Sequence, residues 1–146
     1  MAVLTLGLIA AVAFPAGIAH WRPVLADWPV RLAKVMVVPA FTEELVFRGL
    51  LIPARGESAR PGLWMAAGLL LFVTWHVVEA LTILPGAHLF LTASFLGCAL
   101  ILGAGCVLMR YRTGSLWPAV AFHGSTVFLW QVLFGGPDVS QLLFKA

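Results

Sequence analysis

Residues 62–84 read GLWMAAGLLLFVTWHVVEALTIL, an apolar run whose only ionisable side chains are His76 and Glu79. A membrane-spanning helix needs ~20 mostly apolar residues, and in hydrocarbon its backbone N–H and C=O groups must be hydrogen-bonded within the segment. This run is long enough and apolar enough to meet both conditions. We therefore predict that it crosses a membrane as an α-helix, with its two ionisable side chains facing protein or water.

The composition of the whole chain extends this prediction. Of its 146 residues, 62% are hydrophobic and 10% are charged, whereas soluble domains carry roughly 25% charged residues. With so few charges, most of the outer surface must be apolar, so we expect a lipid bilayer to be its solvent. The net charge of +3 comes from scattered residues without a basic run, which argues against nucleic acid as a partner.

Four further apolar stretches are also long enough to cross a bilayer. The predicted spans cover about residues 2–19, 30–52, 62–84, 87–109 and 115–135. Together they occupy nearly the whole chain and leave no room for a separate soluble domain. We therefore predict an all-α fold, a polytopic transmembrane helix bundle of about five spans, with residues 1–146 forming a single domain.

The fourth span carries small residues at four-residue spacing, Ala93 with Gly97 and Ala99 with Gly103. Such pairs allow helix backbones to approach closely in lipid, where small side chains at the interface favour packing. We predict that this span is a packing scaffold.

Ionisable residues deep in the spans are the main anomaly of the sequence. A charged side chain at the centre of a bilayer costs about 2.5–3.5 kcal/mol on insertion scales, unless it is paired or hydrated. The residues must therefore face one another or water, and we predict a polar cavity at mid-membrane depth that is the functional site. They are Glu43, Glu44, Arg48, His76, Glu79 and His123.

Helix geometry allows three of these residues to meet. Antiparallel spans place Glu43 roughly 15 Å, His76 roughly 21 Å and His123 roughly 12 Å from the same membrane face, at 1.5 Å per residue. Within their own span, Glu44 and Arg48 are four residues apart and can pair on one helix face, while Glu43 points about 100° away from Glu44. The three residues can therefore surround one cavity.

Pro39 precedes Glu43 by one helical turn. A proline inside a helix removes a backbone hydrogen bond and bends the helix. We predict a kink here that opens space beside Glu43.

A metal ion is the alternative to a site made of protein groups alone. Histidine and carboxylate side chains bind zinc, and Glu43, His76, Glu79 and His123 supply four such ligands. The chain contains no His-Glu-x-x-His helix of the metalloprotease type. We predict that no cofactor is needed, with zinc as the alternative.

Three segments resemble motifs of a known family. TEELVFRG at 42–49 matches its Glu-Glu-x-x-x-Arg motif, FVTWH at 72–76 matches Phe-x-x-x-His, and RTGSLWPAVAFH at 112–123 resembles the run before its last histidine. The family is that of the CAAX proteases and bacteriocin-processing enzymes, intramembrane proteases of the glutamic type. The resemblance covers about residues 39–130, with the order and spacing of the motifs preserved.

The resemblance implies a role for each motif residue. Glu43, with His76, would orient and deprotonate a water molecule, His123 would stabilise the oxyanion, and Glu44 and Arg48 would hold the geometry. The implied activity is hydrolysis of peptide bonds in membrane-anchored or lipidated proteins or peptides, including C-terminal processing or cleavage of sorting signals. We expect a multi-pass protein of the prokaryotic cytoplasmic (inner) membrane.

One position departs from the family pattern. The last motif is usually His-x-x-x-Asn, and the fourth residue after His123 is Val127. Loss of one oxyanion donor typically costs ~2.7–4 kcal/mol of barrier. Thr126 and Gln131 share roughly the same helix face and are the candidate replacements. The departure keeps open a non-catalytic binding or immunity protein that reuses the cavity, while a transporter is a weaker alternative because no internal repeat is visible.

Overall fold

The fold of the chain is entirely helical in the computed structural model, which describes residues 1–84 and 86–138. Within these residues 72% of the chain is helical and no strand is present. There are five main helices when the consecutive helical segments from Trp28 to Leu50 are counted as one. The predicted all-α class is confirmed. The predicted single domain of residues 1–146 includes residues 85 and 139–146, which lie outside the described residues.

The apolar run at 62–84 forms α4, Pro61–Thr82. Pro61 occupies the first turn, where its missing N–H has no helical partner to lose. By length and composition, α4 and α5 (Ala93–Thr113) can cross a membrane, with mean hydropathies of 1.6 and 1.8 in their most apolar windows. They account for two of the predicted spans, and the count of five spans stays a prediction.

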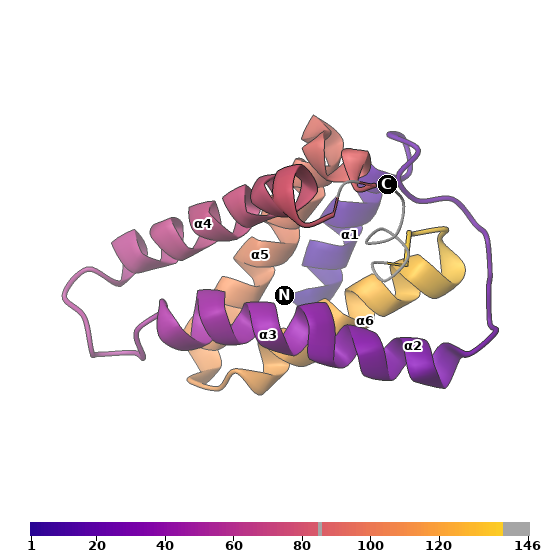
Figure 1. Cartoon of the computed structure of the whole chain (residues 1–146). Helices are drawn as coiled ribbons and strands as arrows, with labels where there is room; N and C mark the ends of the chain where they lie inside the picture. The colour runs from indigo at the N-terminus through magenta and orange to yellow at the C-terminus, as the bar shows by residue number, and fades with distance from the viewer. Residues whose placement is uncertain (85, 139–146) are drawn as a thin grey trace.

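A single kinked helix runs along one side of the molecule, from Trp28 to Leu50 (Figure 1). Its consecutive segments are α2 (Trp28–Val35), η1 (Met36–Phe41), α3 (Thr42–Glu44) and η2 (Leu45–Leu50), where η1 and η2 have the wider turns of a π-helix. Val38 has extended dihedral angles (φ −131°, ψ 118°) just before Pro39, because proline disfavours the helical conformation of the preceding residue. The kink predicted at Pro39 is present.

The first helix, α1 (Ala2–Ala13), ends earlier than the predicted span of residues 2–19. Gly17 adopts a left-handed conformation with φ 71°, and the N–H groups of Ile18 and Ala19 both donate to the carbonyl of Ala13, at 2.9 and 3.1 Å. This arrangement closes the helix end in the way that a glycine just past a helix favours. Apolar composition alone did not reveal it.

The connection from α1 to α2, residues 14–27, passes around the outside of α6 (Trp117–Leu133) (Figure 1). Three of its N–H groups donate to backbone carbonyls at the end of α6: His20 to Phe134 at 3.2 Å, Arg22 to Leu133 at 2.8 Å and Val24 to Val132 at 2.7 Å. The indole Nε1 of Trp130 in α6 donates to the carbonyl of Ile18 at 2.9 Å. These bonds hold the irregular connection against the bundle.

The fourth predicted span, residues 87–109, begins with a short 3-10 turn, η3 (His88–Leu91). The α-helix α5 starts only at Ala93, because the side chain of Thr92 accepts a hydrogen bond from the N–H of Phe95 and caps the helix. The helix extends to Thr113. The predicted span of residues 87–109 therefore corresponds to a helix that begins and ends later in the chain.

The small residues of α5 differ in how closely they are packed. Ala99 is buried, and a Cβ at Gly103 would lie 2.8 Å from Leu69 Cδ1 and 2.9 Å from Arg48 Nη2 and Phe72 Cδ1. At Gly97 nothing lies within 4 Å of that position. The scaffold prediction therefore holds for Ala99 and Gly103, and Gly97 makes no such close contact.

Substitution of Gly103 by alanine is expected to destabilise the protein by about 1–2 kcal/mol, since overpacking outweighs the gain in helix propensity. The buried Arg48 and Phe72 that the new methyl group meets have no exposed side to move into. Gly97→Ala in the same helix is the matched control, and it should leave stability unchanged or raise it by up to ~1 kcal/mol. Thermal unfolding in detergent checks both variants, and equal effects would contradict the packing argument.

Candidate active site

A buried chain of charged and polar groups joins the kinked helix to α6. Glu44 Oε1 lies 3.2 Å from Arg48 Nη1, and His123 Nδ1 donates a hydrogen bond to the same oxygen at 2.8 Å. None of the three side chains is more than 2% exposed. Because Nδ1 is occupied by Glu44, the imidazole of His123 is held in one orientation and presents Nε2 as its free nitrogen.

Arg48 is fixed by contacts on several sides. Its guanidinium carbon lies 3.9 Å from the centroid of the Phe72 ring, a desolvated cation–π contact worth about 2 kcal/mol. The close approach of Gly103 leaves room for the guanidinium. Its nitrogens make the ion pair with Glu44 but no hydrogen bond of good geometry to any described residue. Glu44 is therefore the group that chiefly compensates this buried charge.

Glu43 occupies a different position from its neighbour Glu44. The residue is 8% exposed, and Oε2 has no hydrogen-bond partner among the described residues. This oxygen lies 4.0 Å from Nε2 of His123, a separation that suits a bridging water or substrate atom better than a direct bond. Glu43 can therefore accept a proton from a bound molecule.

His76 approaches Glu43 from α4. Its Nδ1 donates to the carbonyl of Phe72 at 2.9 Å, which leaves Nε2 as a hydrogen-bond acceptor. The ring lies among three phenylalanines, with centroid distances of 4.8 Å to Phe72, 5.8 Å to Phe90 and 5.6 Å to Phe95. This aromatic surround restricts the ring to one position.

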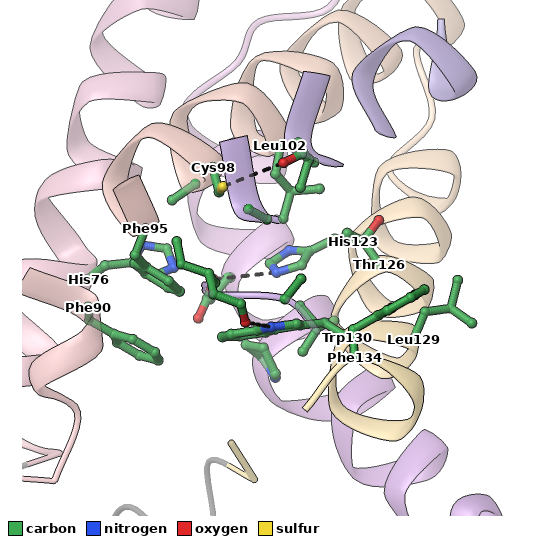
Figure 2. A pocket seen from close by; sticks show the side chains of 18 of the residues that line it. His76, Phe90, Phe95, Cys98, Leu102, His123, Thr126, Leu129, Trp130 and Phe134 are labelled. Carbon is green, nitrogen blue, oxygen red and sulfur yellow. Dashed lines mark hydrogen bonds and ion pairs between the residues drawn. The ribbon is translucent and has the colours of Figure 1, made fainter. Parts of the chain in front are cut away.

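Three predicted site residues, Glu43, His76 and His123, line one cavity of about 670 Å³. Figure 2 shows the imidazole rings of His76 and His123 directed into the cavity from two sides. Most of the lining is apolar and comes from α1, the kinked helix, α4, α5 and α6. The polar lining side chains are Thr42, Glu43, His76, Glu79, His123 and Thr126. The cavity is thus apolar with a polar cluster, and its depth in a membrane stays a prediction.

The candidate metal ligands are brought together only in part. One ligand atom each from Glu43, His76 and Glu79 lies within 4.8 Å of the others. His123 does not join this group, although its Nε2 is 4.0 Å from Glu43 Oε2. Two carboxylates and one histidine match the chemistry of a zinc site with an open coordination position. The structure thus groups three of the four candidate ligands, and whether a metal binds there stays a prediction.

The two proposed substitutes for the missing amide donor differ in position. Thr126 lines the cavity, but its hydroxyl donates to the carbonyl of Phe122 at 2.8 Å. Gln131 is buried, at 4% exposed, and is not among the cavity-lining residues. Val127 itself lines the cavity. The structure therefore places neither side chain as a free donor beside His123.

Two aromatic residues that pack at the site could not be singled out from the sequence. Phe90 and Phe95 stack with a centroid distance of 4.4 Å and an interplanar angle of 8°. They belong to η3 and α5 and pack against His76 from outside its own helix. Only the contacts between elements reveal this role, because phenylalanine in an apolar span is expected in any case.

Comparison with known proteins identifies the class of protein that carries this site. The model of the family described as type II CAAX prenyl endopeptidase Rce1-like matches residues 25–129, well over half of the chain. No curated protein and no solved structure matches significantly. The chain is a membrane protein of the CAAX protease class. It belongs to the Rce1-like family, as the three motifs predicted.

Proposed function

We propose that this chain is an intramembrane endopeptidase that hydrolyses peptide bonds with a water molecule activated by Glu43. The observation that carries the proposal is the Glu43 carboxylate, which has one oxygen within 4.8 Å of a ring nitrogen of His76 and its Oε2 4.0 Å from Nε2 of His123. This Oε2 is buried and has no hydrogen-bond partner among the described residues. Family membership supports a protease. The glutamic mechanism is our assignment.

In the proposed reaction, Glu43 takes a proton from water while Nε2 of His76 accepts the second hydrogen bond of that water and orients it. The resulting hydroxide adds to the carbonyl carbon of the scissile bond. His123, held through Nδ1 by Glu44, faces the oxygen on which negative charge develops and stabilises it from Nε2 when that nitrogen carries a proton. Collapse of the tetrahedral intermediate breaks the C–N bond and releases an acid and an amine.

The apolar lining supports a membrane-anchored or lipidated substrate. A cavity of about 670 Å³ falls in the range of sites that enclose small ligands, so it can hold an acyl or prenyl chain or apolar side chains beside the scissile bond. The family is described as one of prenyl endopeptidases. We infer that the natural substrates are proteins or peptides processed near a membrane anchor, at the prokaryotic cytoplasmic membrane.

A comparison of protein termini in the host membrane tests the proposal. Membranes carrying the unaltered chain, the Glu43→Gln variant and the Glu57→Gln variant are analysed by mass spectrometry. Glu57 lies in the loop before α4, where its carboxylate accepts a hydrogen bond from the N–H of Ala54. The Glu57→Gln variant therefore controls for the loss of a carboxylate away from the cavity. New termini near anchors should appear with the unaltered and Glu57→Gln chains and be absent with Glu43→Gln.

Val127 supports a second candidate, a non-catalytic membrane binder that uses the same cavity. An apolar side chain lines the cavity at the place where the family carries an amide, which removes one oxyanion donor. If all three membranes contain identical termini although the chains are folded and equally abundant, the binder accounts for the result and the protease proposal fails.

Treatment with a metal chelator is expected to leave cleavage unchanged within about 2-fold, because proton transfer by Glu43 requires no Lewis acid. The measurement is the initial rate in detergent before and after chelation, followed by addition of zinc. Loss of activity that zinc restores would instead assign Glu43, His76 and Glu79 as metal ligands.

A further inference from the structure

Glu79 is a half-buried carboxylate that the reaction described above does not use. It follows His76 by three residues in α4, so the two side chains share a helix face. Both line the cavity. A carboxylate oxygen of Glu79, a carboxylate oxygen of Glu43 and a ring nitrogen of His76 lie within 4.8 Å of one another.

The second carboxylate of this cluster gives an independent indication of a ligand-binding role. Glu43 is 8% exposed, lines the same cavity, and has an Oε2 with no hydrogen bond to any described group. The nearby cation does not neutralise the cluster, because Arg48 is already ion-paired with Glu44 at 3.2 Å. Two carboxylates within 4.8 Å of one another in an apolar cavity repel when both are ionised, so the binding of one proton by the pair lowers the free energy.

We propose that Glu79 is a second catalytic carboxylate, which holds this shared proton before the reaction and donates it to the leaving amine. The inference rests on the proposed function and adds to it the general acid. An amine leaves poorly without a proton on its nitrogen, so an acid beside the scissile bond accelerates the step that breaks the C–N bond.

Ionised Glu43 removes one proton from water, and the hydroxide forms a C–O bond to the carbonyl carbon. Protonated Glu79 gives its proton to the amide nitrogen as the C–N bond breaks, so the products are a carboxylic acid and a neutral amine. Glu43 is then protonated and Glu79 ionised, and one proton transfer between them, directly or through Nε2 of His76, restores the starting state.

The experiment compares two probes that differ only in the leaving group. One is an S-farnesylated peptide with an ordinary scissile amide, and the other has a p-nitrophenyl ester in place of that amide. A nitrophenolate leaves without a proton, so the ester needs the base but not the acid. Rates are measured in detergent for the unaltered chain and the Glu43→Gln, Glu79→Gln and Glu57→Gln variants.

We expect Glu79→Gln to lower kcat for the amide by about 10²–10⁴-fold, the usual contribution of a general acid, and to change kcat for the ester by less than about 5-fold. Glu79→Asp, which keeps a carboxylate on a shorter arm, should recover part of the amide activity. Equal losses on both probes would indicate a structural role and overturn the inference. No loss on either probe would overturn it as well.

Failure of the proposed function gives a different pattern. If Glu43→Gln retains both activities, or if the unaltered chain cleaves neither probe while folded, the Glu43 mechanism is rejected for this substrate class, whatever Glu79→Gln does. If Glu79→Gln lowers the thermal unfolding temperature, the inference is judged from Glu79→Asp, which keeps a proton donor. Amide activity that is higher in Glu79→Asp than in Glu79→Gln, with similar ester activity, supports the inference. Equal amide activity in the two variants overturns it.

Discussion

Substitution of Glu43 by glutamine is expected to lower kcat for peptide cleavage by about 10²–10⁴-fold, the contribution of a general base. This corresponds to about 3–5 kcal/mol of barrier at 1.36 kcal/mol for each factor of ten. Glutamine has nearly the same shape as glutamate but cannot accept a proton from water. Since Glu43 makes no hydrogen bond through Oε2 within the described part of the chain, the substitution should break no hydrogen bond at this oxygen.

The measurement is a steady-state rate with the purified protein in detergent or nanodiscs, together with substrate affinity and the temperature of unfolding. Only kcat should change in Glu43→Gln. The Glu57→Gln variant should match the unaltered chain in all three quantities, because Glu57 lies in a loop outside the cavity. A Glu43→Gln variant that cleaves at the normal rate would reject the assignment of the base.

Substitution of Arg48 by methionine is expected to destabilise the protein by about 3–5 kcal/mol, the usual cost of removing one partner of a buried ion pair. Both Arg48 and Glu44 are 0% exposed. Without the guanidinium, the Glu44 carboxylate keeps the hydrogen bond from His123 but loses its cation, and the cation–π contact between Arg48 and Phe72 is lost. Unfolding in detergent by heat or denaturant measures the change.

A double-mutant cycle separates the ion pair from the packing of the side chain. The cycle compares the free energies of unfolding of Glu44→Gln, Arg48→Met and the double variant. The loss in the double variant should be smaller than the sum of the two single losses, because no unpaired buried charge remains. Additive effects, or a loss below about 1 kcal/mol for Arg48→Met, would show that the pair contributes little.

Much of the fold follows from the sequence because lipid imposes strict conditions on it. The run at 62–84 had to be helical, and it forms α4 over Pro61–Thr82. The kink at Pro39 followed from the missing N–H and the restricted residue before it. Helix ends were less predictable, since the end of α1 depends on the left-handed Gly17 and the start of α5 on the cap at Thr92.

The residues of the candidate site could be predicted from the sequence because ionisable side chains inside apolar spans are costly unless they face one another or water. Glu44 and Arg48 pair as their four-residue spacing indicated, and the three candidate catalytic residues line one cavity. Spacing did not indicate that Nδ1 of His123 binds Glu44, because this contact joins elements far apart in the sequence. It also did not indicate that Thr126 bonds to its own helix backbone or that Gln131 lies away from the cavity lining.

The cavity wall formed by α1 and the turn that follows it has a consequence for how this protein can diversify. Leu6, Ile9, Ala13 and Ile18 line the cavity but lie outside the residues 25–129 that the family model matches, whereas Glu43, His76 and His123 all lie inside them. Changes in the first 24 residues would therefore reshape the cavity without altering Glu43, His76 or His123. One part of the cavity wall can therefore vary independently of the three candidate catalytic residues, and a chimaera that exchanges only this segment between relatives is expected to change the shape of the cavity while keeping the polar cluster intact.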